Sequence, residues 1–149
     1  MKVFIGSDHR GYELKNQIRE HLVHKGYDVS VVGGEVKDDN DDYPPISYEV
    51  TSKLLGEDDG TARGVLVCGS GQGMAIAANR VRGIRAALAW SPAEVRAARN
   101  DDDANVLVLP ADMLDVDTAL AVVDVFFEQK FSGEERHQRR IDQIEELYG

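Results

Sequence analysis

The chain has 149 residues, of which 42% are hydrophobic and 30% charged, and its formal net charge is −10. This length suits one domain with a sizeable buried core, and the negative charge argues against nucleic acid or an anionic membrane as a partner. The single cysteine excludes an internal disulfide, and no stretch approaches the ~20 apolar residues of a membrane span. The apolar stretch at the N-terminus is too short for a signal peptide, so we expect a cytoplasmic protein.

Short apolar segments alternate with longer helical patterns along the chain. Strands rich in Val, Ile and Leu are predicted at 2–6, 28–32, 64–68, 84–89 and 105–109. Helical patterns cover 12–26, 46–55, 74–81, 91–100, 115–131 and 134–148. This alternation predicts an α/β fold with a mostly parallel sheet, and in such sheets ligands bind beyond the carboxyl ends of the strands.

Residues 68–73, Cys-Gly-Ser-Gly-Gln-Gly, follow the third predicted strand and lead directly into a helical pattern. Glycines at alternate positions allow the backbone to pass close to a ligand, and a strand–loop–helix unit directs N–H groups toward an anion. A tight strand-to-helix turn would give the same pattern. A dinucleotide site is a weaker interpretation, because the glycines follow the third strand and no acidic residue ends the next one.

Cys68 is the residue at the start of this loop that suggests chemistry. Most buried cysteines are simply small hydrophobic residues. A thiol at the end of a strand that faces a helix N-terminus, however, is expected to have a lowered pKa. Cys68 could then act as a nucleophile or as a general base.

Charged residues gather at two further places. Asp8, His9 and Arg10 follow the first predicted strand, where they could cap a helix or hold a polar substrate. Arg136 and Arg140 lie four residues apart on one helical face, either as a solvated face paired with nearby acidic residues or as a phosphate clamp. The acidic stretches 37–42 and 100–105 lack the spacing of a calcium loop, so we predict no metal site.

Several segments together resemble one enzyme family. The segments "GSDHRGYELK", "DYP", "CGSGQGMAIAANRVRGIRAAL", "ANVL" and "RHQRRID" occur in this order between Met1 and about Ile144. They resemble the type B ribose-5-phosphate isomerases, a family that includes the galactose-6-phosphate isomerase subunits. The resemblance implies a Rossmann-like three-layer α/β/α sandwich with a five-stranded parallel sheet, forming one sugar-phosphate isomerase domain over residues 1–149.

The same resemblance implies an activity and an assembly. The reaction is aldose–ketose isomerisation of ribose 5-phosphate and ribulose 5-phosphate through an enediolate, a step of the pentose phosphate pathway, with no metal or organic cofactor. The implied assembly is a homodimer, or a dimer of dimers, whose active sites are shared between subunits. The C-terminal helix, at about 134–147, could reach the partner subunit.

The resemblance also assigns roles to residues. Cys68 is the general base; some relatives instead use a Glu at the position of Met74. Ser70 and the backbone N–H groups of the loop stabilise the enediolate oxygen; the loop residues are Gly69, Ser70, Gly71, Gln72 and Gly73. The remaining substrate-binding positions are Asp8 and Tyr43 for the sugar, His9, Arg136 and Arg140 for the phosphate, and Arg10 and Asp102 beside them.

The sequence departs from the family pattern at two positions. Asp101 and Asp102 stand where relatives have a His that opens the furanose ring and the Asn after it, and Asp112 stands where relatives often have a phosphate-binding Arg. Asp101 could open the ring, although a carboxylate with an ordinary pKa of about 3.9 suits neutral pH less well than imidazole. Arg10 could partly replace the missing Arg.

Two other interpretations stay open. The substrate could be another phosphosugar: erythrose 4-phosphate and erythrulose 4-phosphate have an open chain and need no ring opening, and a hexose 6-phosphate is a further choice. The chain could also be a non-catalytic phosphosugar-binding protein. We rank ribose 5-phosphate first.

Overall fold

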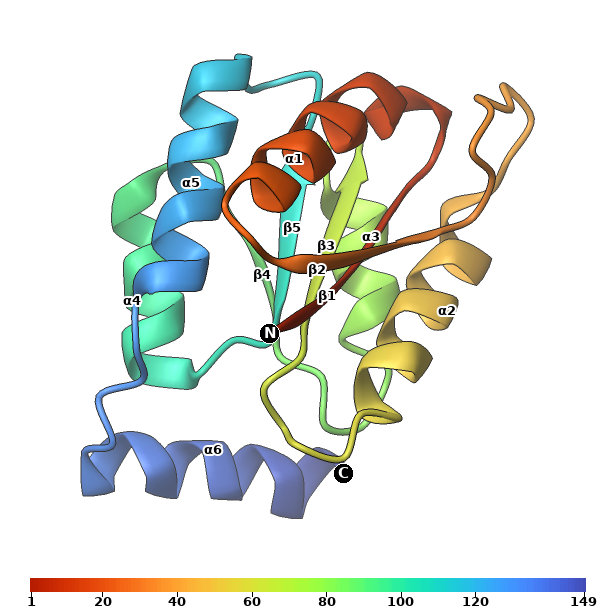
Figure 1. Cartoon of the computed structure of the whole chain (residues 1–149). Coiled ribbons are helices and arrows are strands. Elements are labelled where there is room, and N and C mark those ends of the chain that lie inside the picture. The colour runs from red at the N-terminus through yellow and green to blue at the C-terminus, as the bar shows by residue number, and fades with distance from the viewer.

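The computed structural model describes residues 1–149, in which strands and helices alternate along the chain (Figure 1). The strands are β1 (Lys2–Ser7), β2 (Asp28–Val32), β3 (Arg63–Cys68), β4 (Ala86–Leu88) and β5 (Val106–Pro110). The helices are the 3₁₀ turn η1 (His9–Gly11), α1 (Tyr12–His24), α2 (Tyr43–Leu55), α3 (Gln72–Ala78), α4 (Pro92–Asp102), α5 (Val116–Glu128) and α6 (Glu135–Tyr148). The predicted elements are confirmed, with small differences at their ends.

The five strands form one parallel sheet in the order β2-β1-β3-β5-β4. Helices α1, α4 and α5 pack on one face through a cluster that includes Ile18, Val95 and Phe126. Helices α2 and α3 pack on the other face through a second cluster that includes Val50 and Met74. The predicted three-layer α/β/α sandwich is therefore confirmed.

Several predicted boundaries are wrong by two or three residues, and one of them matters for the site. We expected a helix from Ile46, but α2 begins at Tyr43 and takes both prolines into its first turn. Proline is tolerated there because the first N–H groups of a helix have no intrahelical partner. Tyr43 is thereby fixed at a helix start. Strand β4 is also shorter than the predicted 84–89, because only Ala86–Leu88 pair with β5.

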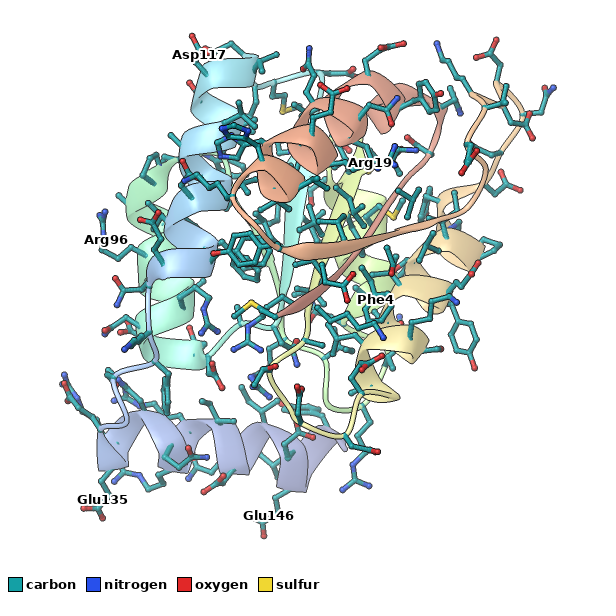
Figure 2. All side chains as sticks on the ribbon, in the orientation of Figure 1. Phe4, Arg19, Arg96, Asp117, Glu135 and Glu146 are labelled. Carbon is teal, nitrogen blue, oxygen red and sulfur yellow. The ribbon has the colours of Figure 1, made fainter.

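The two ends of the sheet are covered differently. All the strands run in the same direction, so their carboxyl ends meet at one edge, where η1, the glycine loop and the β5–α5 connection lie. Helix α6 crosses the molecule at the opposite end, at the bottom of Figure 1, where it packs against α4. Figure 2 shows Glu135 and Glu146 of α6 at that end, pointing away from the sheet, whereas Asp117 at the start of α5 lies at the other end.

None of the helices is both long and apolar enough to cross a membrane. No three His, Cys, Asp or Glu side chains gather in an arrangement that could hold a metal ion.

Candidate active site

Cys68 ends β3 and is only 5% exposed. Side chains alternate along a strand, and Cys68 points to the α2–α3 face, in the cluster that contains Met74. The glycine loop follows at once: Gly71 has a φ of +76°, and the N–H of Gln72 donates to Oγ of Ser70 at 3.3 Å. The left-handed conformation at Gly71 turns the chain so that α3 starts beside the thiol.

The pKa of Cys68 differs from the expectation. We expected a lowered pKa, but burial raises the pKa of this thiol above its ordinary value. The backbone N–H groups of Gly71 and Met74 act in the opposite sense and favour the thiolate, as does the positive charge of Arg10, but they do not outweigh burial. The donors expected from the helix start are present, and the prediction was wrong because it left out desolvation.

An aromatic ring packs against the backbone at Gly73. A Cβ atom at Gly73 would lie 2.5 Å from Cζ of Tyr43, so the ring of Tyr43 rests directly on the backbone at the start of α3. The hydroxyl group of Tyr43 makes no hydrogen bond within the chain. Tyr43 thus presents a free hydroxyl beside the glycine loop, as a sugar-binding group would.

Asp8 and His9 lie at the carboxyl end of β1, next to β3. Oδ1 of Asp8 accepts hydrogen bonds from the N–H groups of Arg10 and Gly11, at 3.0 and 3.1 Å, so the predicted helix-cap role is confirmed. Oδ1 of Asp41 accepts the backbone N–H of His9 at 2.9 Å and lies 2.9 Å from its Nδ1. This hydrogen bond raises the pKa of His9, which favours the imidazolium form.

Arg10 extends over the glycine loop. A Cβ atom at Gly69 would overlap the guanidinium group, which forms an ion pair with Asp112. Asp112 is itself held in place, because its N–H donates to the carbonyl of Gly69 at 3.0 Å. The guanidinium group of Arg10 therefore lies directly over Gly69, the residue that follows Cys68.

The glycine loop, thiol and charged residues lie together at the ligand-binding edge of an α/β sheet, and comparison with known proteins shows the family to which the chain belongs. The family described as Ribose/Galactose Isomerase matches residues 3–144. The chain belongs to this family. Within it, the chain is 42% identical to a probable ribose-5-phosphate isomerase B of Mycoplasma genitalium over 142 residues, 95% of this chain and 92% of that protein. It is 40% identical over 146 residues to ribose-5-phosphate isomerase B of Mycobacterium tuberculosis, covering 98% of this chain and 89% of that one.

Solved structures of the family agree with this assignment. The crystal structure of the Mycoplasma genitalium enzyme with bound ribulose 5-phosphate has a TM-score of 0.92 and 41% identity, covering 97% of this chain and 94% of that chain. The Thermotoga maritima enzyme has a TM-score of 0.91 and 41% identity, covering 98% of each chain.

Four predicted site residues do not lie near Cys68 in the single chain. Asp101 and Asp102 are the last two residues of α4. The backbone carbonyl of Asp102 accepts a hydrogen bond from Nε of Arg85, the residue before β4, at 2.8 Å. Because β3 is six residues long, roughly 17 Å separate its two ends, and Cys68 lies at the far one. Arg136 and Arg140 lie on α6, at the same end of the molecule as Asp102 (Figure 1).

This end has a cavity and exposed apolar side chains. A cavity of about 640 Å³ lies between α3, β4, α4 and α6, and its lining includes Asp102, Ile144 and Tyr148. Leu147 and Tyr148 are 72% and 82% exposed. Arg136 pairs with Glu134 at 2.8 Å, as the solvated-face interpretation expected, whereas Arg140 has no ion-pair partner within the chain.

Three contacting residues were missed at the sequence level. The contact between Asp41 and His9 is not predicted, because nothing local in the sequence indicates that Asp41 reaches His9. Ser132 and His137, which contact each other at 2.6 Å, were also missed. His137 lies within the "RHQRR" segment, but it is buried between two arginines that are exposed, so the charge pattern concealed it.

Proposed function

We propose that this protein interconverts ribose 5-phosphate and ribulose 5-phosphate, with Cys68 as the general base. The observation that carries the proposal is the position of Cys68, a buried thiol that faces the N–H groups of Gly71 and Met74, in a chain about 40% identical to ribose-5-phosphate isomerases B over nearly its whole length.

The chemistry follows from this placement. In the open-chain aldose, the Cys68 thiolate takes the proton from C2, the C2–H electron pair forms the C1=C2 double bond, and O1 becomes an oxyanion. Sγ then returns the proton to C1, while the O2 proton ends on O1 and C2 becomes the carbonyl carbon. Backbone N–H groups of residues 69–73 and Oγ of Ser70 stabilise the oxyanion, each such donor contributing about 3 kcal/mol. A well-placed base contributes roughly 10²–10⁴-fold.

The remaining groups at this edge bind the substrate. The carboxylate of Asp8, whose Oδ2 makes no hydrogen bond within the chain, and the hydroxyl of Tyr43 contact the sugar hydroxyls. His9 and Arg10 supply positive charge for the phosphate, and guanidinium forks match phosphate oxygens.

The site is completed by a second copy of the chain. Arg136 and Arg140 would bind the phosphate, and Asp101 and Asp102 the sugar, but in one chain all four lie at the opposite end from Cys68 (Figure 1). A symmetric dimer can bring this end of one copy to the glycine loop of the other, because both copies use the same pair of surfaces. The exposed Leu147 and Tyr148 of α6 give such an interface apolar area. The protein is thus a homodimer, or a dimer of dimers.

Asp101 takes the role of ring opening. Ribose 5-phosphate is mainly a furanose in solution, so the hemiacetal must open before C2 can lose its proton. Asp101 is half-exposed and is the titratable side chain that α4 offers at this position.

Proton NMR in D₂O tests the proposal. Wild-type protein and Cys68→Ala are incubated with ribose 5-phosphate, and loss of the C2 proton signal and formation of ribulose 5-phosphate are followed. Conversion by wild type with a loss of about 10²-fold or more in Cys68→Ala is expected. If wild type converts erythrose 4-phosphate but not ribose 5-phosphate, the substrate is wrong. If neither sugar exchanges its proton, the isomerase function is wrong.

A further inference from the structure

Ser132, His137 and Asp101 form a connected set of side chains at the end of α4 and the start of α6. Oγ of Ser132 lies 2.6 Å from Nδ1 of His137, and Nε2 of His137 lies 3.7 Å from Oδ1 of Asp101. The side chain of His137 is 6% exposed, whereas that of Asp101 is 47% exposed. The set therefore runs from a buried imidazole to a carboxylate at the surface.

The backbone holds this set from both sides. The N–H of Ser132 donates to the carbonyl of Asn100 at 3.0 Å, and Nδ2 of Asn100 donates to Oδ1 of Asp101 at 2.8 Å. Helix α4 and the segment before α6 are thus joined around the same carboxylate. Asp101 has one oxygen held by the protein, and its other oxygen, Oδ2, makes no hydrogen bond within the chain.

The hydrogen bonds of Ser132 are compatible with one particular tautomer of His137. Oγ of Ser132 accepts the N–H of Glu134 at 3.1 Å, so its own proton is free to be donated to Nδ1 of His137. A neutral imidazole that accepts at Nδ1 carries its proton on Nε2, the atom that faces Asp101. His137 thereby directs its Nε2 proton toward the carboxylate across 3.7 Å, an electrostatic contact that is longer than a hydrogen bond.

We infer that His137, oriented by Ser132, is a positioning residue that holds Asp101 for the ring-opening step. This inference rests on the proposed function. In ring opening, the C1–O4 bond breaks, the O1–H electron pair forms the C1=O1 carbonyl, and one proton moves from O1 to O4. The Asp101 carboxylate takes the O1 proton and returns it to O4, so it begins and ends the step ionised, and His137 keeps its proton throughout.

The inference predicts a separation between two rates. Ribulose 5-phosphate has no free 5-hydroxyl and stays an open chain, so exchange of its C1 protons with D₂O needs Cys68 but no ring opening. Conversion of ribose 5-phosphate needs both steps. Loss of His137 should therefore slow conversion and leave exchange largely unchanged.

The experiment measures both rates by NMR on the same intact protein. We expect Asp101→Asn to lower conversion by roughly 10²-fold and His137→Ala by about ten-fold, with C1 exchange within about two-fold of wild type. His137→Gln, whose amide can donate from near the place of Nε2, should recover most of the conversion. Ile141→Ala is the structural control, since it removes a buried contact of α6 one turn away without touching Asp101, and it should change both rates in parallel.

The outcomes separate the inference from the proposed function. If wild type shows neither exchange nor conversion, the isomerase proposal fails. If wild type shows both, and His137→Ala lowers them equally or lowers neither, the positioning role is wrong and His137 only fastens α6 to α4. Failure of His137→Gln to recover conversion, with its fold intact, would also contradict the inference.

Discussion

His9 contacts Asp41 at two points: Oδ1 of Asp41 accepts the backbone N–H of His9 at 2.9 Å and lies 2.9 Å from Nδ1 of the imidazole. Asp41 belongs to the loop between β2 and α2, which reaches across to the end of β1. The hydroxyl of Tyr12 holds the same loop by donating to the carbonyl of Glu35 at 2.7 Å. The loop thus contributes the carboxylate that raises the pKa of His9 and favours the imidazolium form, which the proposed phosphate-binding role requires.

Replacing Asp41 by Asn should lower the pKa of His9, because the hydrogen bond to Asp41 is the main cause that raises it. Phosphate binding needs the imidazolium. As the pH rises, affinity for inorganic phosphate should therefore begin to fall at a lower pH in the variant than in wild type. The contribution of the His9–Asp41 contact to the free energy of unfolding depends on pH in the same direction. It is fully present below the unfolded-state pKa of about 6.5 and is lost as the pH rises through the raised pKa of the folded state. NMR titration of His9 measures the shift directly. Asp58→Asn, in an exposed loop, should leave it unchanged.

The free thiol of Cys68 should be slow to ionise. Burial raises the pKa of Cys68, so alkylation by iodoacetamide should be slow at neutral pH. The rate should rise only when the pH exceeds the ordinary pKa of a cysteine thiol, about 8.5. The thiolate absorbance provides an independent titration, with Cys68→Ala as the blank. A titration midpoint below the ordinary value of about 8.5 would show that the N–H groups of Gly71 and Met74 outweigh burial.

A methyl group at Gly73 should displace Tyr43. The added Cβ would lie 2.5 Å from Cζ of the ring, and because Tyr43 is partly exposed the ring can swing outward. We expect Gly73→Ala to raise KM about five-fold, the equivalent of one lost hydrogen bond of about 1 kcal/mol, as Tyr43→Phe should. Gly56→Ala is the matched control, since its new atom meets nothing closer than 3.5 Å. Equal KM values in Gly73→Ala and wild type would exclude Tyr43 from the site.

Asp112 should weaken anion binding by occupying Arg10. Both side chains are about half-exposed, so their ion pair contributes at most about 1 kcal/mol. Asp112→Asn frees the guanidinium and should tighten the binding of inorganic phosphate by up to about five-fold, whereas Arg10→Ala should weaken it. Calorimetric titration gives both constants. Weaker binding in Asp112→Asn would mean that Asp112 orients Arg10 instead of competing for it.

Most of the fold could be predicted from the sequence, because it depends on local periodicity. The Val-, Ile- and Leu-rich runs identified the strands, and the helical pattern predicted at 91–100 corresponds to α4. The glycine loop and Cys68 also fall where the sequence placed them, since a strand followed by a glycine-rich turn is a local signal.

The parts that could not be predicted depend on contacts between distant segments. The pair formed by His9 and Asp41 joins residues 32 positions apart, and Arg10 and Asp112 are 102 positions apart. The thiol pKa was wrong for a related reason: desolvation of Cys68 comes from packing in the cluster around Met74, which no local pattern reports. The separation of Asp101, Asp102, Arg136 and Arg140 from Cys68, at opposite ends of the sheet, likewise follows from topology.

The proposed division of the site between two copies can be tested by mixing subunits. Cys68→Ala and the double variant Arg136→Ala/Arg140→Ala are each purified, confirmed as nearly inactive on ribose 5-phosphate, dissociated, mixed in equal amounts and reassembled. If Cys68 of one copy works with the arginines of the other, each mixed dimer contains one intact site, and random pairing restores about a quarter of wild-type activity. If the mixture, shown to contain mixed dimers, stays as inactive as its components, every site uses one chain alone and the shared site is wrong.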